Sequence, residues 1–368
     1  MPRGGGRAAG REPVALKPDE VDRTSRSASP RREGRASVRK RQLGRDGPEV
    51  SELGLGCMGM SDLYGAADEA ESRATIRAAL DAGITLLDTG DFYGMGHNEL
   101  LIRQALEGVP RDRVFIAVKF GALRDPAGAF VGFDARPANV RTYLAYSLRR
   151  LGTDHVDLYQ PARIDPAVPI EETVGAIADL AKAGWVRHVG LSEAGADTTR
   201  RAAAVHPIAA LQIEYSLMSR SVERKVLPTC RELGIAVTAY GVLSRGLLGG
   251  RIGPEGPSRP RDGRGRFPRF QGENLRRNLA LVDALRAIAA EKGATPAQLA
   301  IAWVRSRGPD VIPLVGARRR EQLDEALGAL ELALSPDDLA RIEATVPAEA
   351  VAGARYDVHS MGLLDSER

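Results

Sequence analysis

The sequence predicts an α/β fold, a TIM (β/α)8 barrel preceded by a β-hairpin, and three observations support it. From Gln42 onward, eight short apolar runs are each followed by an amphipathic stretch with helical spacing, the pattern of parallel strands joined by helices. No GxGxxG follows the first strand, which disfavours a dinucleotide-binding doubly wound sheet. Polar residues also stand at or just beyond the ends of many different strands, namely Asp88, Lys119, Gln160, Ser192, Gln212 and Arg318. A barrel gathers all those ends around one axis, whereas an open sheet gathers only those at its switch point.

The expected elements follow in order along the chain. A hairpin is expected from residues 41–43 and 49–53, with Asp46-Gly47 in the turn. The first three strand and helix pairs are expected at 53–56 and 68–82, 85–89 and 98–107, and 114–120 and 139–151. Five more strands, each with a helix after it, are expected at 156–159, 186–191, 210–214, 236–240 and 311–315. The loop after the seventh strand, about residues 243–272, is long and rich in Gly, Pro and Arg, so we interpret it as a lid over a ligand.

The charge of the chain is concentrated at its beginning. The 368 residues include 52 Lys or Arg and 48 Asp or Glu, a formal charge of +4. Residues 1–38 hold nine basic and five acidic side chains, so the remainder is neutral overall. This segment is rich in Gly, Arg, Ser, Ala and Pro, and we interpret it as a disordered basic extension, since it lacks the apolar region of an export signal and is too acidic for a transit peptide. The barrel is expected over residues 39–350 and a C-terminal tail over 351–368.

Composition also excludes several classes of protein. Two cysteines, Cys57 and Cys230, are too few for a disulfide framework, and no apolar run of about eighteen residues could cross a membrane. His206 and His359 lack ligand-like spacing, so we predict no metal. A weakly basic extension gives only salt-sensitive attraction to nucleic acid, so neither nucleic acid nor a membrane is an expected partner. We expect a cytoplasmic protein, and no feature of the sequence indicates its oligomeric state.

Asp88, Tyr93 and Lys119 are the residues best suited to acid–base chemistry. Asp88 ends one expected strand, Tyr93 follows it by five residues, and Lys119 lies near the end of the next strand. A lysine within an apolar strand needs a partner because an isolated buried ammonium is very costly, and Asp88 is the obvious one. A tyrosine beside the lysine is expected to have a lowered pKa and to act as a general acid or base. The alternative is a structural ion pair with Tyr93 as a packed loop aromatic.

A series of motifs resembles the aldo-keto reductase family from about residue 39 to residue 343. They are LGLGCMGMS, DTGDFYG, AVKFG, VDLYQPARIDP, VRHVGLSE, LQIEYSL, AYGVLSRGLL and LVGARRREQLDEAL. The resemblance implies a TIM barrel that reduces aldehydes and ketones with NADPH, without metal or flavin. It implies that Tyr93 donates the proton, that Lys119 tunes it and that Asp88 is the partner of Lys119. The family's substrate-orienting histidine falls on Ala162, and Gln160 and Arg163 are the nearest residues that could replace it.

The resemblance also assigns cofactor contacts. Ser192 and Gln212 are implied to bind the nicotinamide carboxamide and Tyr215 to stack on the ring, with Glu193 where the family often has Asn. Leu243, Ser244 and Gly246 are implied to lie along the pyrophosphate. Arg318 is implied to pair with the 2′-phosphate, Gln322 to support it and Glu325 to accept from the adenine amine. The remaining implied contacts are Cys57, through its backbone, Met58 and Gly316. Ala326 stands where the family usually has Asn.

The arginines after the last strand support a phosphate ligand independently. Arg318, Arg319 and Arg320 open a helix, where the helix dipole favours anions rather than cations. A bound 2′-phosphate would resolve that conflict and would favour NADPH over NADH. The alternative is a solvated basic helix start.

These observations predict an NADPH-dependent oxidoreductase that acts on a small-molecule carbonyl compound. A second hypothesis is an NADPH-binding sensor or regulatory subunit, similar to the potassium-channel β subunits, in which Ala162 makes catalysis slow. A third is reduction of an activated carbon–carbon double bond.

Overall fold

Eight parallel strands close into a barrel, which confirms the predicted fold class. The computed structural model describes residues 38–61, 63–258 and 262–368, so the predicted extension lies outside the described residues except for Val38. The barrel strands, in chain order, are β3 (Gly54–Gly56), β4 (Leu86–Gly90), β5 (Phe115–Phe120), β8 (Val156–Pro161), β9 (Val186–Ser192), β10 (Ile208–Glu214), β11 (Ala236–Tyr240) and β12 (Val311–Gly316). Pairing of β12 with β3 closes the ring.

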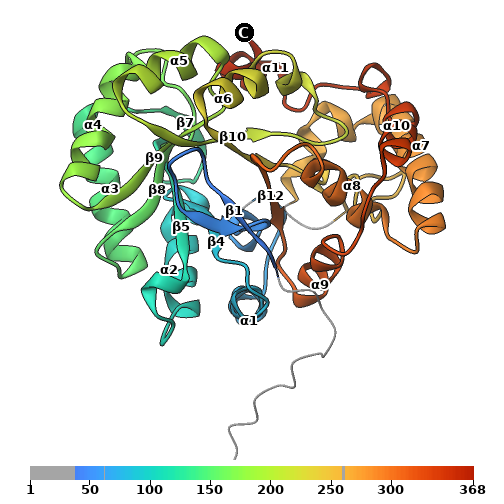
Figure 1. Cartoon of the computed structure of the whole chain (residues 1–368), viewed down its shortest axis with the longest axis horizontal. Helices are drawn as coiled ribbons and strands as arrows, with labels where there is room; N and C mark the ends of the chain where they lie inside the picture. Colours follow the sequence, from blue (N-terminus) through green and yellow to red (C-terminus); the bar gives the residue numbers. More distant parts are fainter. Residues whose placement is uncertain (1–37, 62, 259–261) are drawn as a thin grey trace, which may run out of the picture. The chain divides into compact units, whose positions relative to one another are not determined.

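Helices surround the barrel on its outside, as Figure 1 shows. Those that follow the strands are α1 (Glu69–Asp81), α2 (His97–Ala105), α3 (Pro137–Leu151), α4 (Ile170–Lys182), α5 (Ala196–Val205), α6 (Val226–Leu233), α7 (Gly272–Glu291), α8 (Pro296–Arg305) and α9 (Arg320–Gly328), with α10 (Pro336–Thr345) and α11 (Val358–Gly362) after them. Among the described residues, no helix is both long enough and apolar enough to cross a membrane.

Alternation along the strands divides their side chains between two cores. One set faces the helices, for example Leu87, Val118 and Leu211. The other set fills the barrel interior and consists of Leu86, Phe115, Ala117, Leu158, Ala210, Ala236, Ile312 and Leu314. Successive side chains of a strand point to opposite faces, so the residues two positions further along also point inward. Those residues include Asp88, Lys119, Gln160, Gln212 and Thr238, which therefore form a polar layer above the apolar one.

A short hairpin seals the other end of the barrel. Strands β1 (Lys40–Gln42) and β2 (Glu49–Ser51) pair antiparallel, as predicted. Leu43 and Val50 from this hairpin are fully buried within the interior core. Arg41 also donates from Nη1 to the carbonyl oxygens of Gly308 and Val311, at 2.7 Å each. The hairpin closes the bottom of the barrel and leaves the strand carboxyl ends as the only polar end of the interior.

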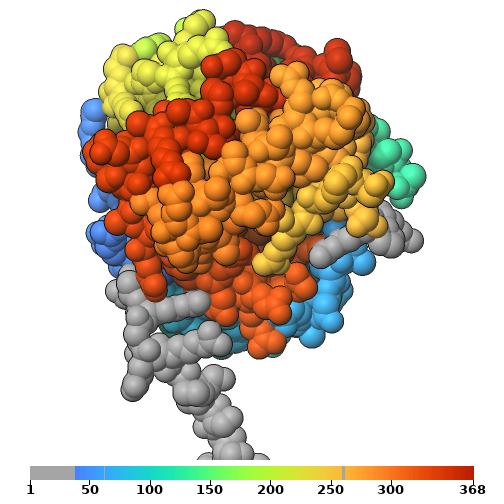
Figure 2. Space-filling view, turned by 90° about the vertical axis from the view of Figure 1, so that its right-hand side faces the viewer, coloured from blue at the N-terminus to red at the C-terminus, as the bar shows by residue number. Residues whose placement is uncertain are grey.

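The structure adds detail to three regions of the sequence prediction. The β5 to α3 connection contains an unpredicted hairpin, β6 (Ala122–Arg124) and β7 (Phe130–Phe133). The long loop after β11 is present, and Phe267, Arg269 and Phe270 bury themselves within it. The C-terminal tail packs against α7, where Asn278 exchanges two 2.9 Å hydrogen bonds with the backbone of Ala352. Figure 2 shows this C-terminal segment (red) beside α7 (orange) on one face of the molecule.

We expect Leu43→Ala to lower the free energy of unfolding by about 2–5 kcal/mol, because it leaves a cavity where the hairpin fills the barrel. Chemical denaturation of the two proteins measures the difference. Leu100→Ala is the matched control, since Leu100 lies on α2 with 44% of its surface exposed. Equal losses for the two variants would contradict the hairpin's role in the core.

Candidate functional site

Asp88 and Lys119 form a buried ion pair at the carboxyl ends of adjacent strands. Lys119 Nζ lies 2.7 Å from both Asp88 Oδ1 and Oδ2, and Gln212 donates from Nε2 to Asp88 Oδ2 at 2.6 Å. All three residues are at most 5% exposed. Burial lowers the pKa of Lys119, and the carboxylate of Asp88 opposes that shift. The predicted pairing of Asp88 with Lys119 is confirmed.

Tyr93 lies beside this pair, in the turn η2 (Tyr93–Gly96) after β4. Lys119 Nζ is 5.2 Å from the centre of its ring, and the side chain is 6% exposed. Burial, and after it the negative charge of Asp88, raises the pKa of Tyr93 well above its ordinary value. The expectation that Lys119 lowers this pKa is wrong, because Asp88 neutralises the ammonium and little water reaches the phenol. Tyr93 is consequently a protonated phenol at neutral pH.

Several buried polar groups near this pair have no hydrogen-bond partner among the described residues. They are Ser192 Oγ, Thr238 Oγ1 and both amide atoms of Gln160. Ser192 and Gln160 are completely buried, and Gln160 is paired in register with Lys119 on the neighbouring strand. Unsatisfied buried polar groups are costly unless something binds them. The Ser192 hydroxyl therefore fits the nicotinamide carboxamide that the sequence assigned to it.

The structure does not support the assignment of Tyr215 to a nicotinamide ring. Tyr215 points out of the barrel, where its ring packs edge-on against Trp303 at 5.5 Å and its hydroxyl donates to Glu223. Gln212 and Glu214 point inward, so a residue one position later must point outward. The aromatic residue that reaches the interior at this height is Tyr240, which is paired with Glu214 at the end of β11. The alternation of side chains along β10 can be read from the sequence, and it places Tyr215 on the outer face, away from a nicotinamide ring.

Most of the backbone groups assigned to the cofactor already have partners. Cys57 N–H donates to Asp88 O, and Cys57 O accepts from Asn98. Ser244 N–H donates to Gly241 O and Gly246 N–H to Leu243 O, within the turn η5 (Ser244–Gly246). In this structure the N–H groups of Cys57, Ser244 and Gly246 donate to neighbouring backbone oxygens, and their contacts with a cofactor stay a prediction. Met58 and Leu243 are half-buried in the same loops, and burial raises the pKa of the Cys57 thiol, which makes it unreactive.

Residues assigned to the adenosine end gather where β12 meets α9. Gly316 is exposed, and a Cβ added there would meet no atom within 4 Å. Arg318 donates from Nη1 to the carbonyl oxygens of Tyr64, Gly65 and Ala66, and its N–H donates to Gln322 Oε1. Glu325 binds Arg251 at 2.9 Å instead of being open to a ligand.

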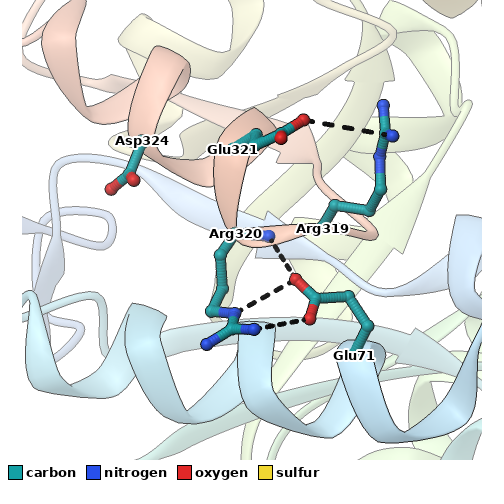
Figure 3. A pocket seen from close by; sticks show the side chains of 5 residues that line it. All are labelled: Glu71, Arg319, Arg320, Glu321 and Asp324. Atoms are coloured by element: carbon teal, nitrogen blue, oxygen red, sulfur yellow. Dashed lines mark hydrogen bonds and ion pairs between the residues drawn. The ribbon is translucent and has the colours of Figure 1, made fainter.

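A shallow hollow of about 500 Å³ adjoins this region, lined by Glu71, Arg319, Arg320, Glu321 and Asp324 (Figure 3). Glu71 accepts from the backbone and guanidinium of Arg320, and Arg319 lies 4.0 Å from Glu321. The hydrogen bond from Arg320 lowers the pKa of Glu71. For Arg320 the conflict with the helix dipole is therefore resolved by Glu71 rather than by a phosphate.

A network of buried charges that the sequence analysis missed joins the C-terminal tail to the barrel. Arg355 in the tail donates to both carboxylate oxygens of Glu193, at 2.9 and 2.5 Å, and lies 3.4 Å from Glu214. Arg245 also binds Glu214, at 3.2 Å. Burial would raise the pKa of Glu193, but the charge and hydrogen bonds of Arg355 outweigh it and lower the pKa. Glu193 is thus bound by the tail and is not available to a carboxamide.

Backbone strain is concentrated in the loops at this end of the barrel. The described non-glycine residues with positive φ are Leu63, Met95, Glu193, Ser244 and Arg245. They follow β3, β4, β9 and β11, and none lies in the hairpin at the opposite end. Such conformations cost free energy and cluster at functional sites. No group of three or more potential metal ligands occurs among residues 38–61, 63–258 and 262–368.

Comparisons with known proteins agree with this geometry. The model of the aldo/keto reductase family matches residues 52–347. The chain is 42% identical over 322 residues to "Probable aldo-keto reductase 1" of Glycine max, covering 87% of this chain and 92% of that one. It is similar to the structure of a glycerol dehydrogenase from Gluconobacter oxydans, with a TM-score of 0.76, 31% identity and coverage of 85% and 97%. It is also similar to an aldo-keto reductase from Bacillus halodurans in its holo form, with a TM-score of 0.72, 28% identity and coverage of 88% and 99%.

We expect Asp91→Asn to stabilise the protein at pH 8 but not at pH 4. Asp91 follows β4, and burial together with the nearby Glu99 raises its pKa to about 7. An unfolded aspartate titrates near pH 3.9, so stability falls as the pH rises from about 4 to about 7 and stays low above that range. Asparagine carries no proton to lose, and the gain at pH 8 should be roughly 1–3 kcal/mol.

Thermal denaturation at both pH values checks this expectation. Asp112→Asn, at an exposed position, is the control and should change stability little at either pH. A gain for Asp91→Asn that is the same at pH 4 and pH 8 would show that the carboxyl does not titrate as stated.

Proposed function

The chain belongs to the aldo/keto reductase family, a family of oxidoreductases that use nicotinamide cofactors, and on that premise we propose that it reduces the carbonyl group of an aldehyde or ketone with NADPH. The observation that carries this proposal is the buried phenol of Tyr93 beside the Asp88–Lys119 pair. A structural ion pair alone would not require a tyrosine hydroxyl at the carboxyl end of the barrel, where active sites of this fold lie. With both cysteines of the chain buried and free, we place the activity in a reducing cytoplasm.

The chain's own residues suit proton transfer to a carbonyl oxygen. Tyr93 is protonated at neutral pH, so its hydroxyl has a proton to donate as a general acid. The phenolate that forms after transfer lies near the ammonium of Lys119, which is 5.2 Å from the centre of the ring and is itself paired with Asp88. Asp88 keeps Lys119 charged and fixed in position. When bound, NADPH supplies the hydride.

Cofactor contacts divide between the two ends of the site. Ser192 Oγ, unpartnered and buried, would bind the carboxamide together with Gln212. Tyr240 rather than Tyr215 would lie against the nicotinamide ring, since it is the aromatic residue that faces the interior. Arg318 would hold the 2′-phosphate at the start of α9, where backbone N–H groups also favour an anion.

A sensor or regulatory role is the second candidate, and Ala162 is the observation that favours it. Ala162 is 2% exposed and offers no side-chain donor to a carbonyl oxygen. Loss of one preorganised donor costs on the order of 10²–10³-fold in rate unless another group replaces it. The sensor therefore predicts tight NADPH binding without useful turnover.

We expect Tyr93→Phe to lower the rate of hydride transfer by about 10²–10⁴-fold while NADPH binding is retained, because only the acid is removed. Stopped-flow oxidation of bound NADPH against a panel of aldehydes, ketones and enones measures the rate. Tyr146→Phe removes the hydroxyl of a tyrosine that is 58% exposed and is the matched control. Turnover below about 10⁻³ s⁻¹ on every compound, against an enzyme median near 10 s⁻¹, would favour the sensor. Reduction of enones alone would favour the double-bond hypothesis.

We expect Arg318→Ala to weaken NADPH binding by about 10–100-fold and NADH binding by much less, since only NADPH has a phosphate for the guanidinium to pair with. Fluorescence titration with both cofactors measures the two losses. Arg320→Ala is the control, because that guanidinium is held by Glu71. Equal weakening of the two cofactors by Arg318→Ala would refute the phosphate contact.

A further inference from the structure

Arg163, immediately after Ala162 at the end of β8, is a half-buried cation with no carboxylate within ion-pair distance among the described residues. Its Nη1 donates to the carbonyl oxygen of Ala162 at 2.6 Å and its Nη2 to the hydroxyl of Tyr356 at 3.1 Å. The guanidinium also lies over the Tyr356 ring, 5.8 Å from its centre. All these partners are neutral. Arg163 therefore donates only to neutral oxygens and forms no direct ion pair with a described carboxylate.

The acids of this region are already paired with other arginines. Glu193 and Glu214, both completely buried, bind Arg355, and Glu214 also binds Arg245 and lies 3.6 Å from Arg269. Asp88 is committed to Lys119 and Gln212. Arg355 also binds Glu367 at 2.9 Å, so each of these carboxylates is already engaged by another cation. An anionic partner for Arg163 would therefore have to come from a bound molecule.

A directed chain of hydrogen bonds holds Arg163 in place. Glu193 accepts from the Tyr240 hydroxyl at 2.7 Å, which uses the single phenolic proton of Tyr240. At the 3.0 Å contact between the two hydroxyls, Tyr356 must therefore be the donor. Its oxygen remains free to accept from Arg163. Tyr356, in the tail, has no proton left for a substrate, whereas the guanidinium has five N–H groups, of which the described contacts use only part.

Arg163 is close to the reacting groups but far from the phosphates of a cofactor. It directly follows the end of β8, where Gln160 is paired in register with Lys119 and Ala162 N–H donates to Phe120 O at 2.8 Å. Its positive charge also acts on the pKa values of both Tyr93 and Lys119. Strand β8 lies four strands from β12 in either direction around the barrel, so the two are diametrically opposite. A cofactor phosphate held by Arg318 after β12 is therefore on the other side of the barrel from Arg163. The missing anion must belong to the molecule that reaches Tyr93.

We propose that Arg163 binds a carboxylate of the substrate, so that the preferred substrates are oxo acids, compounds that carry a carboxylate as well as the aldehyde or ketone. This inference rests on the proposed carbonyl reduction and narrows it to a substrate class. A guanidinium matches a carboxylate through two parallel N–H bonds, and one unbalanced cation matches a monoanion. Tyr356 acts as a positioning residue because it aims the guanidinium without contacting the substrate.

The test compares 4-carboxybenzaldehyde with its methyl ester, which has the same aldehyde but no charge. We expect wild-type kcat/KM to favour the acid by about 10–100-fold, the range of a charge-assisted hydrogen bond. Arg163→Met should bring the acid-to-ester ratio to about one or below. Arg141→Met is the matched control, since that exposed guanidinium binds Asp179 on the helix surface, and it should leave the ratio unchanged. A partly unfolded sample lowers both rates together, so the ratio reports on the contact alone.

Tyr356→Phe provides a second, milder variant. It keeps the ring under the guanidinium but removes the hydroxyl. We expect KM for the acid to rise about 3–10-fold with little change in kcat, because the lost contact is made equally in the ground state and the transition state. A wild type that reduces acid and ester equally well would overturn this inference while leaving carbonyl reduction intact. Failure to reduce either aldehyde would instead overturn the proposed function. An acid-to-ester ratio that survives Arg163→Met would likewise overturn the role of Arg163.

Discussion

Strict alternation of side chains along eight parallel strands is the constraint on which the whole site depends. It sends Leu86, Ala117 and Leu158 into an apolar layer and, two residues later, Asp88, Lys119 and Gln160 into a polar layer. The hairpin of Leu43 and Val50 closes the apolar end, so polar side chains have only the carboxyl end of the barrel to occupy. Catalytic groups from distant parts of the chain meet there because of the geometry of the barrel.

Burial then determines the chemistry of these groups. Because Asp88 neutralises Lys119, the ion pair leaves little net charge beside Tyr93. Tyr93 therefore remains a protonated phenol. An acid that keeps its proton until a carbonyl oxygen develops negative charge is more useful here than a phenolate. The same reasoning applies to Glu193, which remains ionised only because Arg355 is present. The two buried pairs therefore have different tasks: one prepares a proton donor, and the other fastens the tail.

Residues whose position follows from strand periodicity could be predicted from the sequence, and residues that depend on long loops could not. The barrel, the entry hairpin and the Asp88–Lys119 pair belong to the first group. The contacts of Arg355 and Tyr356 belong to the second, since nothing local in the tail indicates which strand end it meets. For Tyr215 the family resemblance implied an inward position, whereas the alternation of side chains along β10 predicts an outward one. The cofactor contacts of Cys57 and Gly246 stay predictions, and the local partners of their backbone N–H groups are ones that no side-chain pattern reveals.

The departures from the family pattern become consistent when they are taken together. Ala162 offers no side-chain donor, and the next residue, Arg163, places a guanidinium against the hydroxyl of Tyr356. Glu193, which replaces an amide, fixes Tyr240 and through it Tyr356 and Arg163. A neutral amide at position 193 would leave Arg355 without an ionised partner there and would weaken the tail that carries Tyr356. The unusual residues at positions 162 and 193 are thus linked through one chain of hydrogen bonds, which runs from Glu193 through Tyr240, Tyr356 and Arg163 to the carbonyl oxygen of Ala162.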